Sequence, residues 1–256
     1  MILAVDIGNS NIVLGGIHGD EICFQAKIHT EPTKTSDDYC IDLRILMDVN
    51  RVDPSQIEGA IIASVVPQVL NSMKTAIRKL TGKTPLVVGP GLKSGLNLAV
   101  ENPAQTGADI VAGCVAALRE HQPPLIVIDM GAATTMMVLD QNGTFVGGSI
   151  SPGVKMSLDA LTDRTALLPG LQLDQPKQTI GRNTNDAMRS GIMLGAAAML
   201  DGMCQRMEDE LGHPAKVIAT GTMAKFVTPL CSRPILYDQD LLLKGLGIIY
   251  RENAGM

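Results

Sequence analysis

Apolar residues along the chain fall into short continuous runs, which suit buried strands, and into longer runs with helical period. The first run, Ile2 to Val5, enters a polar stretch and is followed by a second apolar run, Ile12 to Ile17, as in a β-hairpin. Helices are predicted at about 36–49, 67–80, 184–211 and 241–250, and further strands at 59–65, 86–88 and 216–219. This alternation predicts an α/β fold.

The hairpin pattern occurs twice in the sequence. The stretch from Asp6 to Asn11 joins the first pair of apolar runs, and the stretch Asp129-Met130-Gly131-Ala132-Ala133-Thr134 joins a second pair, Leu125 to Ile128 and Thr135 to Leu139. The second copy begins about half a chain after the first. We therefore expect two similar domains, residues 1–118 and 119–256.

The first hairpin has the chemistry of a phosphate-binding loop. Such a loop needs accessible backbone N–H groups and an oxygen ligand near Mg²⁺. Gly8 is free to adopt positive φ, and Asp6 supplies a carboxylate. One such hairpin is equally typical of an ordinary turn. Because there are two, we expect facing domains that hold a nucleotide triphosphate in the cleft between them, with the turn Thr220-Gly221-Thr222 against the adenosine.

Two other nucleotide-binding motifs are excluded. The sequence contains no Gly-x-x-x-x-Gly-Lys-Ser/Thr, so it is not a P-loop protein. The glycine-rich stretch Gly89 to Gly95 follows a strand, but the next residues, Leu96 to Val100, look extended where a dinucleotide-binding fold requires a helix. We interpret Gly89 to Gly95 as a loop.

Asp109 has a structural and a functional interpretation. It precedes the apolar positions of a helix, and the spacing from Thr106 predicts a capping box with Thr106 at the N-cap and Asp109 at the third helical position. The functional alternative is that this carboxylate orients or deprotonates a substrate hydroxyl for attack on the γ-phosphate. Both interpretations remain open from the residues alone.

The long helix predicted at 184–211 has a continuous apolar stripe, with steps of three and four residues. The stripe consists of Met188, Ile192, Ala196, Met199, Met203, Met207 and Leu211. Such a stripe belongs by default to the core, and a dimer seam is the alternative.

Composition and charge narrow the range of partners. The chain is 45% hydrophobic and 18% charged, with a net charge of −5 and no Trp. It has no stripe of basic and aromatic residues, so we expect no nucleic-acid partner.

The scattered cysteines and histidines, with no Cys-x-x-Cys, indicate buried thiols rather than a zinc site. The N-terminus has no basic leader, and the longest helical apolar stretch, Gly191 to Leu200, is too short to span a bilayer. We expect a cytoplasmic protein with no membrane partner.

In order and spacing, a series of motifs over nearly the whole chain resembles the type III pantothenate kinases. The motifs are Asp6-Ile7-Gly8-Asn9-Ser10-Asn11, Asp37-Asp38-Tyr39, Ser64-Val65-Val66-Pro67, Gly107-Ala108-Asp109, Asp129 to Thr135, Gly147-Gly148 with Pro152-Gly153, Arg164 to Pro169, Ile180-Gly181 with Thr184, and Ser190-Gly191. Any one of them alone is a weak signal. Together they identify the family.

The resemblance implies two similar actin-like (ribonuclease H-like) domains with an interdomain nucleotide cleft. It implies a homodimer that transfers phosphate from ATP to pantothenate, using Mg²⁺ and a monovalent cation, K⁺ or ammonium. Asp109 would be the base, Asp129 would hold the monovalent cation and Asp6 the Mg²⁺. The implied ATP contacts are Asp6, Ile7, Gly8, Asn9, Ser10, Asn11, Ile12, Val13 and Ala132. The implied pantothenate contacts are Gly107, Ala108, Asp109, Ile110 and Thr184.

Four positions depart from the family pattern. The family usually has Arg directly after the base and Tyr a few residues before it, where this chain has Ile110 and Val100. An Arg offers a carboxylate two charge-assisted hydrogen bonds, whereas Ile offers none. Ala132 replaces a customary Thr, and Thr222 replaces the second Gly of Thr-Gly-Gly.

The missing groups must be replaced from elsewhere. We expect the partner chain to supply them through the N-terminus of the helix near Thr184, or through Arg164 or Arg182 in loops. The apolar stripe would then be the dimer seam.

Alternatives to a pantothenate kinase are a kinase for another small hydroxy acid and a catalytically silent regulatory relative, because members of this family have been described as accessory factors of transcription. Retention of Asp6, Asp109 and Asp129 favours an enzyme.

Overall fold

The computed structural model describes residues 1–255, which form two compact units. The first unit comprises 1–96, 101–119 and the segment from Asp240 onwards, and the second comprises 97–100 and 120–239. This division differs from the expected halves 1–118 and 119–256, because the last helix returns to the first unit. The sequence predicts where the second hairpin begins, but it does not predict which of the two sheets the last helix packs against.

The first unit is built on a five-stranded sheet in the order β3-β2-β1-β4-β5. Its strands are β1 (Ile2–Ile7), β2 (Asn11–His18), β3 (Glu21–His29), β4 (Gly59–Ser64) and β5 (Leu86–Val87). The central strand β1 pairs antiparallel with β2 and parallel with β4. Every residue of β1 is buried except Asp6, the second-to-last residue, which is partly exposed.

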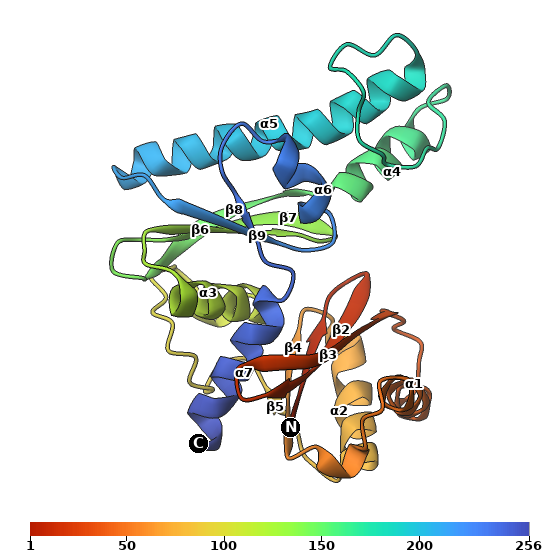
Figure 1. Ribbon diagram of the computed structural model, residues 1–256, viewed down its shortest axis with the longest axis vertical. Coiled ribbons are helices and arrows are strands. Elements are labelled where there is room, and N and C mark those ends of the chain that lie inside the picture. The colour runs from red at the N-terminus through yellow and green to blue at the C-terminus, as the bar shows by residue number, and fades with distance from the viewer. Residues whose placement is uncertain (256) are drawn as a thin grey trace. The chain divides into compact units, whose positions relative to one another are not determined.

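Helices cover both faces of this sheet. They are α1 (Ser36–Val49), α2 (Pro67–Thr81) and α7 (Leu241–Ala254), while α3 (Ala108–Glu120) approaches α7, where a Cβ on Gly245 would overlap the Ala112 backbone. On one face Leu14 belongs to the core that α1 and α2 complete. The next residue, Gly15, points to the opposite face, where a Cβ would overlap Leu243 of α7. Figure 1 shows α7, in dark blue, beside the red strands of this sheet.

The second unit is built on a five-stranded sheet in the order β10-β9-β6-β7-β8. Its strands are β6 (Leu125–Met130), β7 (Ala133–Leu139), β8 (Phe145–Pro152), β9 (Lys216–Thr220) and β10 (Leu236–Tyr237). Its helices are α4 (Val154–Arg164), α5 (Thr184–Leu211) and the single-turn α6 (Ala224–Val227).

The two sheets share one topology. Strand β6 occupies the place of β1, since it pairs antiparallel with the next strand, β7, and parallel with β9. Strands β8 and β3 take equivalent edge positions, and β10 follows β9 in parallel as β5 follows β4. The expectation of two similar α/β domains is therefore confirmed.

Helix α5 spans 28 residues, and its most buried apolar side chains are Met193, Ala197, Leu200 and Cys204. The predicted stripe lies along the edge of this face. Met188 within it is buried, while Ile192, Ala196, Met199, Met203 and Met207 are partly buried and pack against the same core. These six of the seven stripe residues therefore pack in the core, as the default interpretation held, whereas Leu211 is partly exposed and does not belong to that cluster. No helix within residues 1–255 is long and apolar enough to cross a membrane.

All five cysteines are unpaired. Cys114 and Cys204 are buried, as expected, and burial raises the pKa of the Cys114 thiol to about 12. Cys23 on β3 is exposed, so the expectation of buried thiols holds only in part.

Candidate active site

The turn of the first hairpin presents open backbone N–H groups. Gly8 N–H donates to the Asn11 carbonyl at 3.0 Å and closes the turn, leaving Asn9 and Ser10 exposed at its tip. Within residues 1–255, the N–H groups of Asn9 and Ser10 donate to no protein acceptor. Adjacent free N–H groups at a glycine-containing turn are suited to phosphate oxygens.

Gly8 is needed for a different reason from the one expected. Its φ is not positive, but a Cβ at this position would lie 3.2 Å from the Asn11 carbonyl oxygen. A side chain would therefore press on the hydrogen bond that closes the turn. Glycine keeps the turn tight and its outer surface clear.

Asp6 lies at the end of β1, one residue before the turn, and its side chain is partly buried. Beside it, the segment from Ser64 leaves β4, and the Val65 N–H donates to the Ile7 carbonyl at 3.1 Å. The Ser64 hydroxyl accepts the Val66 N–H at 3.1 Å and so shapes the entry into α2. The Ser64-to-Pro67 motif thus supports the strand end that carries Asp6.

Asp109 is the second residue of α3, with its carboxylate partly buried against the helix start. Its Oδ1 atom accepts the Ile110 N–H at 2.8 Å, and a Cβ on Gly107 would overlap this oxygen. Burial raises the pKa of the Asp109 carboxyl, and the hydrogen bonds from backbone N–H groups oppose that rise. A carboxylate with a raised pKa is a stronger proton acceptor.

The predicted capping box is wrong. Helix α3 begins at Ala108, so Asp109 is one position earlier in the helix than predicted. The Thr106 N–H, which a capping box would direct to Asp109, donates instead to the Pro103 carbonyl at 3.2 Å. The cause is a short 3₁₀ helix, Pro103–Gln105, which uses this N–H before α3 starts. The remaining local role of Asp109 is its bond to Ile110.

The second hairpin places Asp129 near the end of β6, beside the turn that follows β9. Asp129 pairs with Thr220 across the sheet, and Gly221 has a φ of 95°. A Cβ on Gly221 would overlap the Asp129 carboxylate, so glycine allows the backbone to approach this carboxylate closely. Ala132 lies in the hairpin turn, where its carbonyl accepts the Gly153 N–H at 3.1 Å.

Thr184 lies at the edge of a pocket of about 720 Å³ in the second unit. It is the exposed first residue of α5, after the N-cap Asn183, whose side chain accepts the Asp186 N–H. Arg182 also lines the pocket, together with apolar residues of α4, α5 and the segment between them. Arg164, expected in a loop, is the last residue of α4 and is not among the lining residues.

Each unit therefore assembles part of the expected site. The first unit carries the Asp6 hairpin and Asp109, and the second carries Asp129, Ala132 and Thr184. Among residues 1–255, no three His, Cys, Asp or Glu side chains form a cluster able to cage a metal ion. Sequence patterns did not single out Thr30, whose hydroxyl contacts the first hairpin. The alternation of Ile22, Phe24, Ala26 and Ile28 would have revealed the strand that ends beside it.

Known proteins resemble this chain over its full length. The profile of the family "Type III pantothenate kinase" matches residues 2–206. A type III pantothenate kinase from an Exiguobacterium species is 42% identical, and the alignment covers 99% of both chains. The one from Halalkalibacterium halodurans is 38% identical over 99% of this chain and 100% of its own.

Solved structures share the fold at much lower identity. A conserved protein described as a Baf family transcriptional activator, from Campylobacter jejuni, has a TM-score of 0.64 at 18% identity, covering 99% of this chain and 100% of its own. The activator of 2-hydroxyisocaproyl-CoA dehydratase from Clostridium difficile, solved with bound ADPNP, has a TM-score of 0.57 at 12% identity, covering 97% of this chain and 93% of its own. These likenesses concern the fold alone. By family profile and by full-length identity, the chain belongs to the type III pantothenate kinases.

Proposed function

We propose that Asp109 is the general base with which this enzyme transfers phosphate from ATP to pantothenate. The enzyme is a pantothenate kinase, whose product, 4'-phosphopantothenate, is formed in the first step of coenzyme A biosynthesis. The observation that supports the assignment is the partly buried Asp109 carboxylate, whose raised pKa suits it to accept a proton.

In the proposed reaction, the hydroxyl oxygen of pantothenate attacks the γ-phosphorus of ATP. The bond between this phosphorus and the oxygen that bridges to the β-phosphate breaks, and ADP leaves with the bridging oxygen. Asp109 accepts the proton of the attacking hydroxyl. The bond from the Ile110 N–H to Oδ1 fixes the carboxylate. Its other oxygen is thereby oriented for the substrate.

The open turn of the first hairpin is the proposed phosphate site, with ATP contacts over Asp6, Ile7, Gly8, Asn9, Ser10, Asn11, Ile12 and Val13. Asp6 would hold hydrated Mg²⁺, which neutralises charge on the β- and γ-phosphates when bound. The residues fit this role, because Mg²⁺ is ordinarily held by one or two carboxylates together with phosphates and water.

Asp129 would hold the monovalent cation, K⁺ or ammonium, and Ala132 would contact ATP. Asp129 fits this role because its carboxylate supplies oxygen ligands and the Gly221 turn lies close beside it. A bound cation would balance the charge of this carboxylate near nucleotide phosphates. The role of Ala132 would be through its backbone, since its methyl side chain has no polar atom.

We place the pantothenate carboxylate in the pocket beside Thr184. Arg182 lines this pocket with its cationic side chain, and the start of α5 adds N–H groups. These groups would take over the role of the arginine and tyrosine expected from the family pattern, at the positions where this chain has Ile110 and Val100. Gly107, Ala108 and Ile110 would contact the other end of the substrate, next to Asp109.

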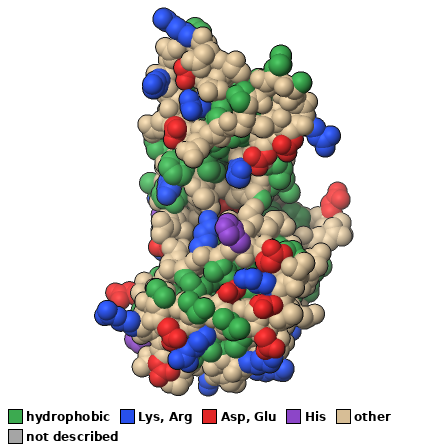
Figure 2. All heavy atoms as spheres, turned by 90° about the vertical axis from the view of Figure 1, so that its right-hand side faces the viewer, with side chains coloured by type: hydrophobic (Ala, Val, Ile, Leu, Met, Phe, Trp, Pro, Cys, Tyr) green, Lys and Arg blue, Asp and Glu red, His purple; other side chains and the backbone are tan. Residues whose placement is uncertain are grey.

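A second copy of the chain would bring this pocket to the base. Apolar side chains stand exposed around the pocket: Met156 and Leu161 on α4, and Leu167 and Ile180 on the segment that follows it. Leu167 is 91% exposed and Ile180 is 82% exposed, and large apolar residues that gather in one exposed patch mark protein–protein contact sites. Figure 2 shows hydrophobic side chains on the surface of the second unit, in its upper part. This surface replaces the α5 stripe as the proposed dimer interface.

A coupled assay of ADP release tests the proposed function. It should compare pantothenate with analogues that lack the carboxylate or carry other hydroxy acid groups, each with and without K⁺. Turnover that requires pantothenate supports the assignment. If the enzyme instead prefers another hydroxy acid, the pantothenate assignment fails, and Ile110 and Val100 would reflect a different substrate. Because ATP and pantothenate are cytoplasmic metabolites, we propose a cytoplasmic location.

A further inference from the structure

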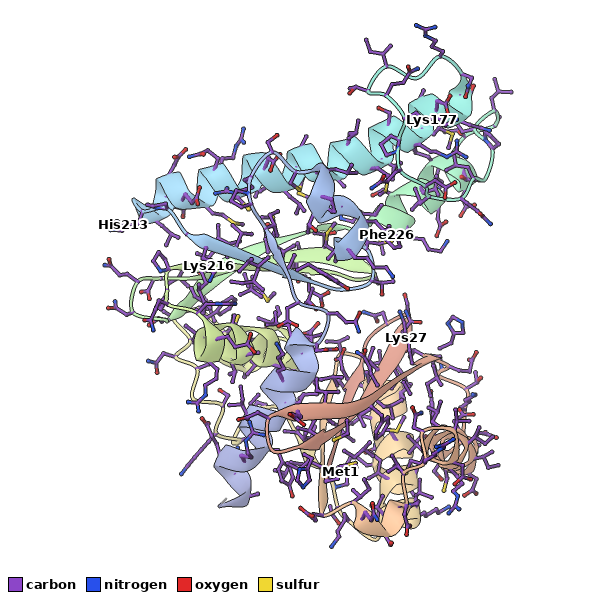
Figure 3. The ribbon with its side chains drawn as sticks, viewed as in Figure 1. Met1, Lys27, Lys177, His213, Lys216 and Phe226 are labelled. Carbon is purple, nitrogen blue, oxygen red and sulfur yellow. The ribbon has the colours of Figure 1, made fainter. Side chains whose placement is uncertain are left out.

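Thr30 holds the turn of the first hairpin through two hydrogen bonds. Its hydroxyl donates to the Gly8 carbonyl at 2.6 Å, and its backbone N–H donates to the Ser10 carbonyl at 3.1 Å. Thr30 directly follows β3, three residues after Lys27, which Figure 3 labels on that strand. The two bonds engage carbonyls on both sides of Asn9, at the tip of the turn.

These bonds set the direction of the N–H group that the turn presents. The Gly8–Asn9 peptide is trans, so its C=O and N–H lie in one rigid plane and point in opposite directions. Fixing the Gly8 carbonyl toward Thr30 therefore fixes the Asn9 N–H away from it. The Asn9 N–H donates to no protein acceptor within residues 1–255, so it remains directed outward for a ligand.

We infer that Thr30 is a positioning residue for nucleotide phosphate, because its hydroxyl orients the Asn9 N–H in the phosphate-binding turn. The inference rests on the proposed assignment of this hairpin to ATP. A preoriented N–H group binds phosphate without first paying the entropy of ordering the turn. Thr30 does this without itself touching the ligand.

Thr30 is in turn held from the protein core. The Tyr39 hydroxyl donates to the Glu31 carbonyl at 2.8 Å and lies 3.2 Å from the Glu31 N–H, which donates to it. Tyr39 is completely buried on α1. Both backbone groups of the residue after Thr30 are thus tied to a fixed side chain. The position of the Thr30 hydroxyl is therefore not left to a mobile loop.

The second hairpin has no equivalent hydroxyl. There the residue after the third strand is Gly153, whose N–H donates to the Ala132 carbonyl at 3.1 Å. A Cβ on Gly153 would overlap that carbonyl, so this position accepts only glycine. The two hairpins share topology but differ in this contact. The hydroxyl clamp is a property of the first hairpin, where phosphate binding is proposed.

The test compares Thr30→Val, which removes the hydroxyl but keeps the branched shape, with Thr30→Ser, which keeps the hydroxyl. Calorimetry measures the affinity for a nonhydrolysable ATP analogue with Mg²⁺, and steady-state kinetics separates KM for ATP from KM for pantothenate. Thr30→Val should weaken nucleotide binding about five- to ten-fold, the effect of one lost hydrogen bond. KM for pantothenate and the melting temperature should stay close to wild type, and Thr30→Ser should bind nucleotide within about two-fold of wild type.

Asp6→Asn separates failure of this inference from failure of the proposed site. If Asp6→Asn weakens binding of the Mg²⁺ complex but Thr30→Val does not, the hairpin binds ATP and the positioning role is overturned. If neither substitution weakens it, the hairpin assignment itself fails, and the inference fails with it. A Thr30→Val loss shared equally by ATP and pantothenate, with a lowered melting temperature, would show a merely structural role.

Discussion

The Asp109 carboxylate turns back onto the start of its own helix, where Oδ1 accepts the Ile110 N–H at 2.8 Å. The Ile110 N–H thus fixes one oxygen of the carboxylate that we propose as the base, while the Ile110 side chain offers no cation to a substrate. Orientation of the Asp109 carboxylate and recognition of the substrate carboxylate can therefore be tested with separate substitutions.

Replacing Asp109 with Asn should abolish most phosphoryl transfer while leaving the fold nearly intact. The amide cannot accept the substrate proton, so kcat should fall about 10²-fold or more. The amide oxygen can still accept the Ile110 N–H, so helix α3 keeps this contact. ADP release and thermal unfolding measure the two effects.

Asp38→Asn, at the capping box of α1, is the matched control and should lower stability without this loss of kcat. Undiminished turnover in Asp109→Asn would leave only the local structural role.

The pH dependence should reveal the raised pKa of Asp109. The base works when deprotonated, so the acid limb of the kcat/KM profile should lie at higher pH than an ordinary aspartate would give. For stability, the folded pKa exceeds the unfolded one, so this carboxyl favours the folded state fully only below the unfolded pKa. Its contribution is lost as pH rises through the folded pKa. The melting temperature of Asp109→Asn minus that of wild type should therefore increase across this window. A difference that does not vary with pH would contradict the raised pKa.

Replacing Asp129 with Ala should remove activation by K⁺. The substitution deletes the proposed carboxylate ligand while leaving the Gly221 turn in place. Initial rates in K⁺, in Na⁺ and in Tris free of ammonium measure the effect, with Asp140→Ala, in the β7–β8 turn of the same unit, as the control that should retain activation. A wild-type enzyme that is equally active in all three buffers would remove the cation site altogether.

Introducing charge at the exposed apolar surface of the second unit should yield monomers. The double substitution Leu167→Asp and Ile180→Asp places carboxylates at residues that are 91% and 82% exposed, so it should not disturb folding. Sedimentation should show loss of the dimer, and pantothenate use should fall sharply while ATP-analogue binding persists. Ile41→Asp and Ile45→Asp, on exposed positions of α1, serve as the matched control. Fully active monomers, or a monomeric wild type, would refute the shared pocket.

Two glycine substitutions in helices should change stability in opposite directions. A Cβ on Gly245 of α7 would overlap the Ala112 backbone, so Gly245→Ala should destabilise the protein by about 1–3 kcal/mol. Around Gly195 of α5 there is open space, so Gly195→Ala should stabilise it by about 0.4–1 kcal/mol. Urea unfolding measures both. Equal effects would mean that α7 does not pack closely on α3.

Local patterns predicted much of the fold. Apolar runs around Asp6 and Asp129 located both hairpins, and capping and periodicity located α1 and α5. Packing partners were not predictable, because an apolar helix such as α7 shows that it is covered but not which sheet covers it. The predicted stripe of α5 was offset from the most buried face for the same reason, since Met199 and Leu200 are both apolar and only tertiary contacts distinguish them.

The site was predicted less completely than the fold. Asp6 and Asp109 could be singled out from the sequence, because the Asp6 hairpin is repeated at Asp129 and Gly107-Ala108-Asp109 is one of the motifs that resemble the family, and their roles stay predictions. Thr30 was not, since its importance depends on Gly8, which lies far from it in sequence and beside it in the folded unit. A one-residue shift also defeated the capping prediction at Thr106, where a 3₁₀ turn took the N–H first.

The return of α7 to the first sheet affects the order in which the chain can fold during translation. The β1–β2 hairpin is synthesised first, yet Leu243, which packs against Gly15 on one face of its sheet, lies in α7, the last helix to be synthesised. The second unit has all of its residues once Gln239 has been synthesised. N-terminal domains ordinarily complete their folding first on the ribosome. In this protein the N-terminal unit finishes last, so a nascent chain stalled before Leu241 would carry a complete second unit beside a half-covered first sheet, a natural substrate for chaperones.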